Sequence, residues 1–426
     1  MKVFLYTLGC KVNSCETESM AAVLAQNGFE PAETLEAADI VVVNSCTVTE
    51  ASDKKTRSFI RRAKRRNPDV LTVLTGCFPQ AYPKESAALL DADIVTGNTR
   101  RKDIADFIFR FLETGDRIVD ISSHKENDVM WHVPLNTQGR TRAFMKIEDG
   151  CDNRCSYCIL PIARGSVRSL PLDSIRDQAL RFAANGYKEI VLTGINLSSY
   201  GKETGLSLAD AVFAADVPGI ERIRLSSLEP ELMSESLTER LSGCQKLCAQ
   251  FHLSLQSGCD RTLSDMGRRY TAGDFRDVMI MLQKYFDEPT FTTDIMVGFP
   301  TETDDDFNES MRFVTGCGFL KCHIFSYSAR PGTEAAKLSQ IPKVIRESRA
   351  KSMADAANDM RRAVMARQIG KKVQVVAEKI NPGEEAEGFS ERYVPVKVRG
   401  LGIRQGDMVG AVITGVGDGF CLAEKV

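Results

Sequence analysis

The chain has 426 residues, which is more than one ordinary core holds, so we expect two or three domains. Apolar residues make up 43% and the formal net charge is −2, so any contact with nucleic acid has to come from a local patch rather than from overall charge. No apolar run approaches the roughly 18 residues of a membrane span, and the first residues lack a signal-peptide pattern. We therefore expect a cytoplasmic protein without membrane contact, whose thirteen cysteines indicate metal binding or catalysis rather than disulfides.

Residues 1 to about 125 alternate short apolar runs with amphipathic stretches. A strand followed by a helix, repeated along the chain, predicts a doubly wound parallel sheet. We expect strands at 3–8, 40–43, 71–74 and 94–95, and helices at 16–27, 50–66, 82–90 and 100–112.

Three cysteines, Cys10, Cys46 and Cys77, each follow the end of one of these strands by one to three residues. The ends of parallel strands point to one edge of a sheet, where such folds bind their ligands. A single cysteine in this position is usually a small buried hydrophobe, but three in the same relative position predict a shared iron-sulfur cluster. We expect Cys15 to open the first helix and to take no part.

From Arg142 to about Arg367 a longer alternation of strands and helices follows, after a connecting segment of weak periodicity. Six strand-helix units predict an open, partial (β/α)6 barrel with its site at the carboxyl ends of the strands. The strands are expected at 143–147, 189–192, 222–225, 251–254, 291–295 and 319–324, and the helices at 172–185, 206–215, 231–242, 272–286, 302–316 and 343–368.

From Gly370 to the end the pattern changes to alternation with a period of two, separated by glycine-rich turns. This predicts a small all-β barrel, of the kind that binds oligonucleotides or packs on a neighbour. Phe389 and Tyr393 are candidates for stacking on RNA bases, or for the core of that barrel.

The loop after the first barrel strand holds Cys151, Cys155 and Cys158 at C-x3-C-x2-C spacing. A zinc site normally adds a second pair of ligands, which is missing here, and a redox dithiol leaves Cys151 unexplained. An iron-sulfur cluster explains all three thiols, and because a cubane takes four ligands, three leave one iron open for a substrate or cofactor.

The cysteine spacing of this loop resembles that of the radical S-adenosylmethionine superfamily, and the whole chain resembles the methylthiotransferases within it. The segments 9–13, 44–49 and 75–77 match the N-terminal domain of that family. The segments 11–18 and 162–165 are most similar to the branch that acts on threonylcarbamoyladenosine next to the tRNA anticodon. Sister branches act on isopentenyladenosine in tRNA or on an aspartate of a ribosomal protein.

The resemblance implies four segments: an N-terminal methylthiotransferase domain at 1–125, a linker at 126–141, a radical S-adenosylmethionine partial barrel at 142–368, and a TRAM-like RNA-binding β-barrel at 369–426. It implies two 4Fe-4S clusters, on Cys10, Cys46 and Cys77 and on Cys151, Cys155 and Cys158. S-adenosylmethionine on the open iron of the second set would yield the radical that takes hydrogen from C2 of the adenine. The first set would carry or donate the sulfur, methylated by a second S-adenosylmethionine.

The implied partners are the anticodon stem-loop of a tRNA and an electron donor such as flavodoxin or ferredoxin. A rival hypothesis of another class is a zinc-dependent RNA-binding protein without enzymatic activity.

Polar and glycine residues at the ends of the barrel strands are expected to position the cofactor; the alternative is that they are ordinary strand-end groups. We expect Tyr157 to pack beside the cluster or the adenine. The positioning residues are Gly194, Glu229, Gln256 and Asp294.

The segment 53–66 carries eight basic residues against one acid and is predicted to be a helix that begins just after Cys46. Such a run is often a solvated helix face, but its position beside the predicted site makes it a candidate for binding an RNA backbone. The candidate RNA-binding residues are Lys54, Lys55, Arg57, Arg61, Arg62 and Arg65.

Overall fold

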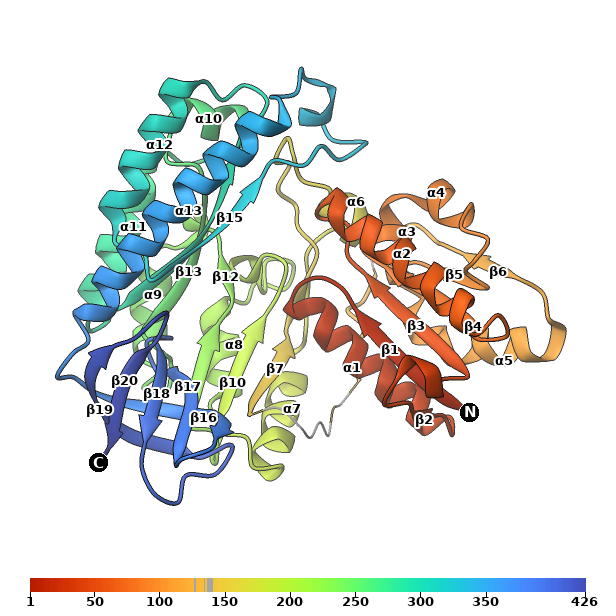
Figure 1. Ribbon diagram of the computed structural model, residues 1–426, viewed down its shortest axis with the longest axis horizontal. Helices are drawn as coiled ribbons and strands as arrows, with labels where there is room; N and C mark the ends of the chain where they lie inside the picture. Colours follow the sequence, from red (N-terminus) through yellow and green to blue (C-terminus); the bar gives the residue numbers. More distant parts are fainter. Residues whose placement is uncertain (126–127, 134, 136–140) are drawn as a thin grey trace. The chain divides into compact units, whose positions relative to one another are not determined.

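The computed structural model describes residues 1–125, 128–133, 135 and 141–426 (Figure 1). The chain divides into two compact units. The first, which we call the N-terminal unit, joins Met1–Leu135 with Glu148–Leu170 and Ser328–Ala336; the second, which we call the barrel unit, contains 141–147, Pro171–Tyr327 and Lys337–Val426. The loop with Cys151, Cys155 and Cys158 therefore belongs to the N-terminal unit.

The N-terminal unit is built on one parallel sheet in the order β2-β1-β3-β4-β5-β6. The central strands β3 and β4 are buried along their whole length, which accounts for their nearly continuous Val and Leu sequences. The strands are β1 (Lys2–Thr7), β2 (Glu30–Pro31), β3 (Ile40–Ser45), β4 (Leu71–Gly76), β5 (Ile94–Thr96) and β6 (Ile118–Asp120).

Helices cover both faces of this sheet. On one face Ile40 and Val42 pack with side chains of α1 and α5, and on the other Val41 and Val43 pack with side chains of α2 and α3. This is the alternation that a doubly wound sheet requires, and it confirms the predicted fold class for this unit. The helices are α1 (Lys11–Gln26), α2 (Glu50–Arg66), α3 (Cys77–Ala81), α4 (Pro83–Ala87) and α5 (Ile104–Thr114).

Two later segments complete the N-terminal unit. The loop with the second cysteine triad is closed at its base by antiparallel pairing of β8 (Glu148–Asp149) with β9 (Arg168–Ser169), and it contains α6 (Leu160–Arg164). The segment 328–336 is held by Arg330, a buried residue that donates to Thr47 at 2.8 Å and to Asp53 at 2.5 Å.

The barrel unit contains two parallel sheets, of order β11-β10-β7 and β12-β13-β14-β15, which a parallel bridge from Ile223 to Leu247 links near their junction. Together they form the predicted open, partial barrel (Figure 1). The strands are β7 (Arg142–Lys146), β10 (Glu189–Thr193), β11 (Arg222–Leu225), β12 (Ser227–Leu228), β13 (Gln250–Gln256), β14 (Thr290–Val297) and β15 (Lys321–Ser326). The helices are α7 (Leu172–Ala184), α8 (Leu208–Ala215), α9 (Glu235–Ser242), α10 (Asp260–Asp265), α11 (Ala272–Tyr285), α12 (Asp304–Cys317) and α13 (Lys343–Ala366).

The last part of the barrel unit is a closed β-barrel in the order β16-β17-β18-β20-β19, as predicted. Buried core residues alternate with more exposed residues along its strands, and Val364 and Met365 of α13 pack against that core. The strands are β16 (Lys372–Asn381), β17 (Glu385–Ser390), β18 (Pro395–Arg399), β19 (Met408–Val416) and β20 (Cys421–Lys425).

One expectation about the first helix is wrong. Helix α1 begins at Lys11, directly after Cys10, and not near Glu16. Cys15 therefore does not open the helix but lies buried within its first two turns. The polar start of α1 hid its true beginning, because Asn13 and Glu16 are buried by polar contacts that apolar periodicity does not detect.

Candidate active site

The first cysteine triad lies at the carboxyl ends of three neighbouring strands. Cys10 caps the start of α1 after β1, Cys46 follows β3 directly, and Cys77 is the first residue of α3 after β4. Since β1, β3 and β4 are adjacent and parallel, the three residues reach the same edge of the sheet. Cys10 is exposed, whereas Cys46 and Cys77 are buried.

The chain packs tightly around these three residues. Gly9 has φ +117°, and a Cβ atom added there would lie 2.7 Å from Cβ of Cys46, so only glycine lets the turn before Cys10 approach Cys46. Desolvation by burial raises the pKa of Cys46 to about 12, with a further contribution from Cys77. Bound iron would reverse this, because a thiol that coordinates metal is deprotonated.

The donor set at this edge fits an iron-sulfur cluster. The backbone N–H of Val48 donates to Sγ of Cys46 at 3.5 Å, and Nδ2 of Asn98 lies 3.7 Å from Sγ of Cys77. Hydrogen bonds to the thiolate sulfurs tune the reduction potentials of such clusters. Among the residues that the structure describes, no three His, Cys, Asp or Glu side chains gather as ligands of a single metal ion. Three thiols at one edge of the sheet are a donor set that an iron-sulfur cluster uses.

The second triad lies on a short loop whose three cysteines are all half-buried. Gly150 enters the loop with φ +94°, and an added Cβ there would lie 2.0 Å from the carbonyl oxygen of Ser166, so the entry requires glycine. The N–H of Cys151 donates to Gly165 at 3.0 Å, and that of Cys158 to Cys155 at 3.1 Å. Tyr157 is half-buried in the same loop, beside Cys158. Accessible thiols on one loop suit a cluster that keeps an iron open.

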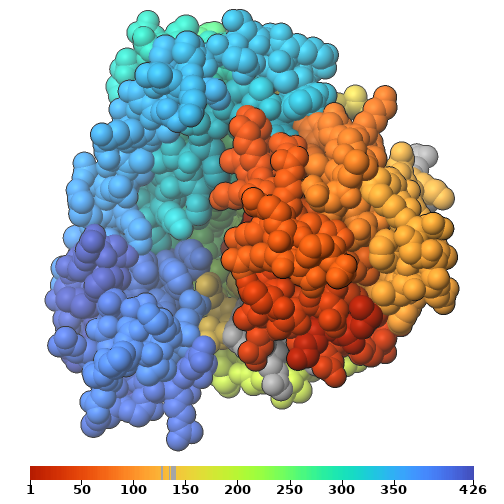
Figure 2. Space-filling model, turned by 45° about the vertical axis from the view of Figure 1, so that its right-hand side comes forward, coloured from red at the N-terminus to blue at the C-terminus, as the bar shows by residue number. Residues whose placement is uncertain are grey.

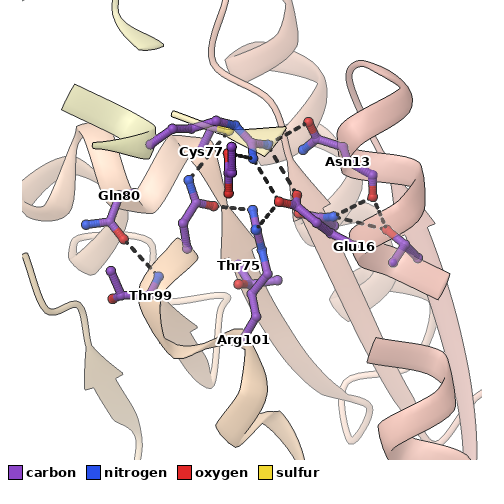
Figure 3. A network of polar contacts seen from close by, with 12 residues as sticks. Asn13, Glu16, Thr75, Cys77, Gln80, Thr99 and Arg101 are labelled. Atoms are coloured by element: carbon purple, nitrogen blue, oxygen red, sulfur yellow. Dashed lines mark hydrogen bonds and ion pairs between the residues drawn. The ribbon is translucent and has the colours of Figure 1, made fainter. Parts of the chain in front are cut away.

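A buried polar network joins the surroundings of the two triads (Figure 3). Arg164 of α6 donates through Nη1 to Oε1 of Glu16 at 2.8 Å and to Oδ1 of Asp149 at 2.9 Å. Through Nη2 it donates to Oδ1 of Asn13 at 3.2 Å, and that oxygen also accepts from Sγ of Cys10 at 3.3 Å. The first helix and the cysteine loop are therefore held together by one guanidinium group.

The same carboxylate oxygen of Glu16 is also contacted by a second arginine. Nη1 of Arg101 lies 2.6 Å from Oε1 of Glu16, and Arg101 also donates to Asn98. Asn98 in turn reaches Cys77 and the carbonyl of Ala163. In Figure 3 Arg101 extends toward Glu16 near Cys77.

Six residues of the network were not predicted as site residues: Asn13, Glu16, Asn98, Arg101, Asp149 and Arg164. Three of them, Asn13, Glu16 and Arg164, fall within the segments 11–18 and 162–165 that carried the family resemblance. That resemblance was the only sequence signal for them, since nothing in either segment alone shows that the two meet.

The predicted cofactor-positioning residues lie in the barrel unit. Gly194 follows β10, Glu229 follows β12, and Gln256 ends β13 with φ +67°. Asp294 was expected at a strand end, but β14 continues to Val297, so Asp294 lies inside the strand. Met296 and Val297 directly precede Gly298, so the sequence places them in the loop, whereas the structure includes them in the strand.

Both carboxylates, Glu229 and Asp294, have a nitrogen-bearing side chain as partner. Arg268 forms an ion pair with Glu229, although desolvation by burial still raises the pKa of Glu229. Asp294 lies 3.2 Å from Nε2 of His252; burial alone would raise its pKa, but His252 and His323 lower it. The structure gives both groups fixed positions, as a cofactor-binding role requires.

The basic helix α2 presents two different faces. Four of the six predicted residues, Lys54, Arg57, Arg61 and Arg65, line one groove of about 690 Å³ together with Ser58, Lys64 and Asp91. Lys55 and Arg62 do not line it, and the guanidinium of Arg62 instead lies 4.7 Å from the ring of Phe59. In the space-filling view of Figure 2 the segment of α2 is orange-red.

Phe389 and Tyr393 are engaged inside the barrel unit. Their rings stack with centroids 4.5 Å apart, Arg142 lies over both, and Arg224 lies over Tyr393. Because these ring faces already contact protein, we do not expect them to stack on RNA bases.

In the part of the chain that the structure describes, no helix is both long enough and apolar enough to cross a membrane.

Comparisons with known proteins agree on one family. The model described as "Uncharacterized protein family UPF0004" matches residues 2–97, and the "Radical SAM superfamily" model matches residues 145–314. Threonylcarbamoyladenosine tRNA methylthiotransferase MtaB of Thermotoga maritima is 38% identical, over 92% of this chain and 90% of that protein. The protein of the same name from Aquifex aeolicus is 35% identical, over 94% and 97%.

More distant similarities extend to a sister group and to solved structures. A tRNA-2-methylthio-N(6)-dimethylallyladenosine synthase of Clostridium novyi is 32% identical, over 88% of this chain and 85% of that protein. The radical S-adenosylmethionine methyltransferase TsrM of Kitasatospora setae, solved with cobalamin and a [4Fe-4S] cluster, superposes with a TM-score of 0.58. It is 15% identical, over 79% of this chain and 77% of that chain, and supports the fold alone.

Proposed function

The chain belongs to the methylthiotransferase family of radical S-adenosylmethionine enzymes, and we propose that it inserts a methylthio group at C2 of N6-threonylcarbamoyladenosine in tRNA. The substrate on this proposal is the anticodon stem-loop of a tRNA that already carries the threonylcarbamoyl group.

The observation that carries the proposal is the placement of both cysteine triads in one compact unit. The N-terminal sheet supplies Cys10, Cys46 and Cys77, and the loop with the second triad packs into the same unit through Arg164. A radical generator alone needs one three-cysteine site. A second such site, tied to the first by buried hydrogen bonds, supports a reaction that also delivers sulfur.

On this proposal Cys151, Cys155 and Cys158 hold one 4Fe-4S cluster, and Cys10, Cys46 and Cys77 hold the other. The chemistry that these groups supply when bound is reductive cleavage of S-adenosylmethionine together with delivery of the sulfur and the methyl group. The protein itself binds and orients the reactants and keeps water away from them.

Residues of the barrel unit are proposed to orient S-adenosylmethionine. Glu229, fixed by Arg268, and Asp294, fixed by His252, offer acceptors whose positions do not depend on the ligand. Gly194 and Gln256 lie at strand ends, where backbone groups are accessible to a cofactor. Tyr157 is proposed to pack beside the cluster or the adenine.

The proposed partners are a tRNA and an electron donor. The groove on α2 would bind the phosphate backbone of tRNA, with Lys55 and Arg62 contacting it from the neighbouring face. The reaction consumes electrons, which a flavodoxin or ferredoxin would supply. Action on tRNA supports a cytoplasmic location.

The test is mass spectrometry of tRNA nucleosides from a host with and without the gene. We expect the deletion to remove the methylthio group from N6-threonylcarbamoyladenosine alone, and the intact gene to restore it while a Cys46→Ala gene does not. Loss of the group from isopentenyladenosine, or from a ribosomal protein aspartate, would instead assign the chain to a sister branch. An unchanged nucleoside profile would contradict the proposal.

A further inference from the structure

The side chain of Arg164 has an unusual environment. It is 1% exposed, and its charge is shared between two carboxylates, Glu16 and Asp149. Although burial lowers its pKa, Cys77, Glu16 and Asp149 raise that pKa well above the usual value, so the group is a permanent cation.

Its Nε–H remains without an acceptor among the described residues. A buried N–H that lacks a partner is destabilising, and such a group calls for an explanation. The four hydrogen bonds of the two terminal nitrogens already fix the guanidinium, so the free N–H is not a consequence of a loose side chain.

The cation is linked to the N-terminal triad by hydrogen bonds. Nη2 of Arg164 donates to Oδ1 of Asn13 at 3.2 Å, and the same oxygen accepts from Sγ of Cys10 at 3.3 Å. The residue before Arg164, Ala163, accepts through its carbonyl oxygen from Nδ2 of Asn98, which also lies 3.7 Å from Sγ of Cys77.

Arg164 belongs to α6, on the loop that carries Cys151, Cys155 and Cys158, yet it contacts Asn13 and Glu16 of the helix that follows Cys10. Among the described residues, Arg101 also contacts Glu16, and Arg168 also contacts Asp149. These three guanidinium groups and two carboxylates sum to one positive charge, before any cluster is counted.

We propose that Arg164 is a positioning residue of the N-terminal cluster, whose charge raises the reduction potential of that cluster and whose Nε–H donates a hydrogen bond to one of its sulfur atoms. A fixed cation favours the more negative, reduced state, and a hydrogen bond to sulfur acts in the same direction. The cysteine loop thereby sets the redox properties of the cluster bound by the other triad. This inference rests on the proposed function.

The test is a potentiometric titration of the N-terminal cluster, followed by electron paramagnetic resonance. The full chain with Cys151, Cys155 and Cys158 replaced by Ala would be reconstituted anaerobically, so that only one cluster is observed. We expect Arg164→Met to lower the ratio of reduced to oxidised cluster at a fixed potential at least tenfold. For a one-electron couple this is a downward shift of the reduction potential by at least about 59 mV. Arg164→Lys, which retains the charge, should shift the potential less than Arg164→Met.

Two further variants keep the test decisive if Arg164→Met does not fold. Glu16→Gln removes a negative charge from the same network and should shift the potential in the opposite direction, upward. Arg168→Met is the matched control: Arg168 contacts Asp149 at 3.4 Å and donates to the carbonyl oxygen of Arg164 at 2.8 Å, but among the described residues it makes no hydrogen bond to Asn13, Glu16 or a thiol. Its potential should match the parent chain.

Equal potentials in the parent chain and Arg164→Met, or equal shifts in Arg164→Lys and Arg164→Met, would overturn the inference. So would a shift in Arg168→Met as large as that in Arg164→Met, or a downward shift in Glu16→Gln. Failure of the parent chain to assemble any cluster on Cys10, Cys46 and Cys77 would overturn the proposed function as well, which distinguishes the two failures.

Discussion

At the scale of single residues, Glu189 shows how this chain uses buried charge. Its side chain is 0% exposed and contacts Nε of Arg224 at 2.9 Å, Nη1 of Arg222 at 3.4 Å and Nη1 of Arg142 at 3.9 Å. Arg222 and Arg224 also donate to backbone carbonyls of 374 and 389–391 in the closed barrel. One carboxylate thus holds the arginines that attach the closed barrel to the partial barrel.

Replacing Glu189 by Gln should destabilise the protein strongly at neutral pH. Removing one member of a buried ionic group leaves uncompensated charge and costs about 3–5 kcal/mol. The measurement is the free energy of urea unfolding at pH 7. Glu221→Gln is the control, since Glu221 pairs with Lys188 at an exposed site, and it should change that free energy by less than about 0.5 kcal/mol.

The same variant has a predicted pH dependence. Burial would raise the pKa of Glu189, but Arg224, Arg142 and Arg222 outweigh it and hold the pKa below its usual value of 4.5. A depressed pKa contributes stability that is complete above the ordinary value and is lost as the pH falls through the folded value. The difference between the parent chain and Glu189→Gln should therefore shrink below pH 4.5. A difference that stayed constant into acid would contradict this account of Glu189.

At the scale of elements, helix α2 was predicted with its observed bounds, Glu50–Arg66. The side chain of Thr49 caps its start by accepting from the N–H of Ser52 at 3.3 Å, and basic residues fill its last turn. Helix α1 and strand β17 were less predictable. The first buries polar residues, and the sequence of the second, Glu385–Ser390, has too little apolar character to show its alternation.

Neutralising the groove of α2 should weaken tRNA binding and reduce its dependence on salt. In the variant Arg57→Gln, Arg61→Gln, Arg65→Gln, three phosphate contacts are lost, and the slope of log affinity against log salt should fall by about 2, at roughly 0.7 per contact with a single strand. Filter binding at several salt concentrations measures this slope. Lys84→Gln with Lys102→Gln, two exposed residues of the same unit outside α2, is the control and should leave the slope unchanged. Equal effects of both variants would show that the groove has no special role.

At the scale of the whole molecule, the order of elements was predictable and the contacts between distant segments were not. Strand ends placed Cys10, Cys46 and Cys77 at one edge of a sheet because parallel strands share a direction. No periodicity could show that Arg164 reaches Glu16, 148 residues away, or that Asp149 accepts from the same guanidinium. Local patterns determine elements, whereas such networks depend on how completed elements pack.

The domain boundaries at 125, 141 and 368 remain predictions. Within the described residues the N-terminal unit takes in the cysteine loop and the segment 328–336, both from the part of the chain assigned by sequence to the partial barrel. The unit is thus assembled from three stretches of chain, and both cysteine triads depend on its folding.

The iron content of the reconstituted chain tests most directly whether each triad holds a cluster. Two cubane clusters predict about eight irons per chain, and about four after replacement of either Cys10, Cys46 and Cys77 or Cys151, Cys155 and Cys158 by Ala. Elemental analysis after anaerobic reconstitution and desalting gives this number. About four irons in the parent chain, or zinc in place of iron, would contradict the account.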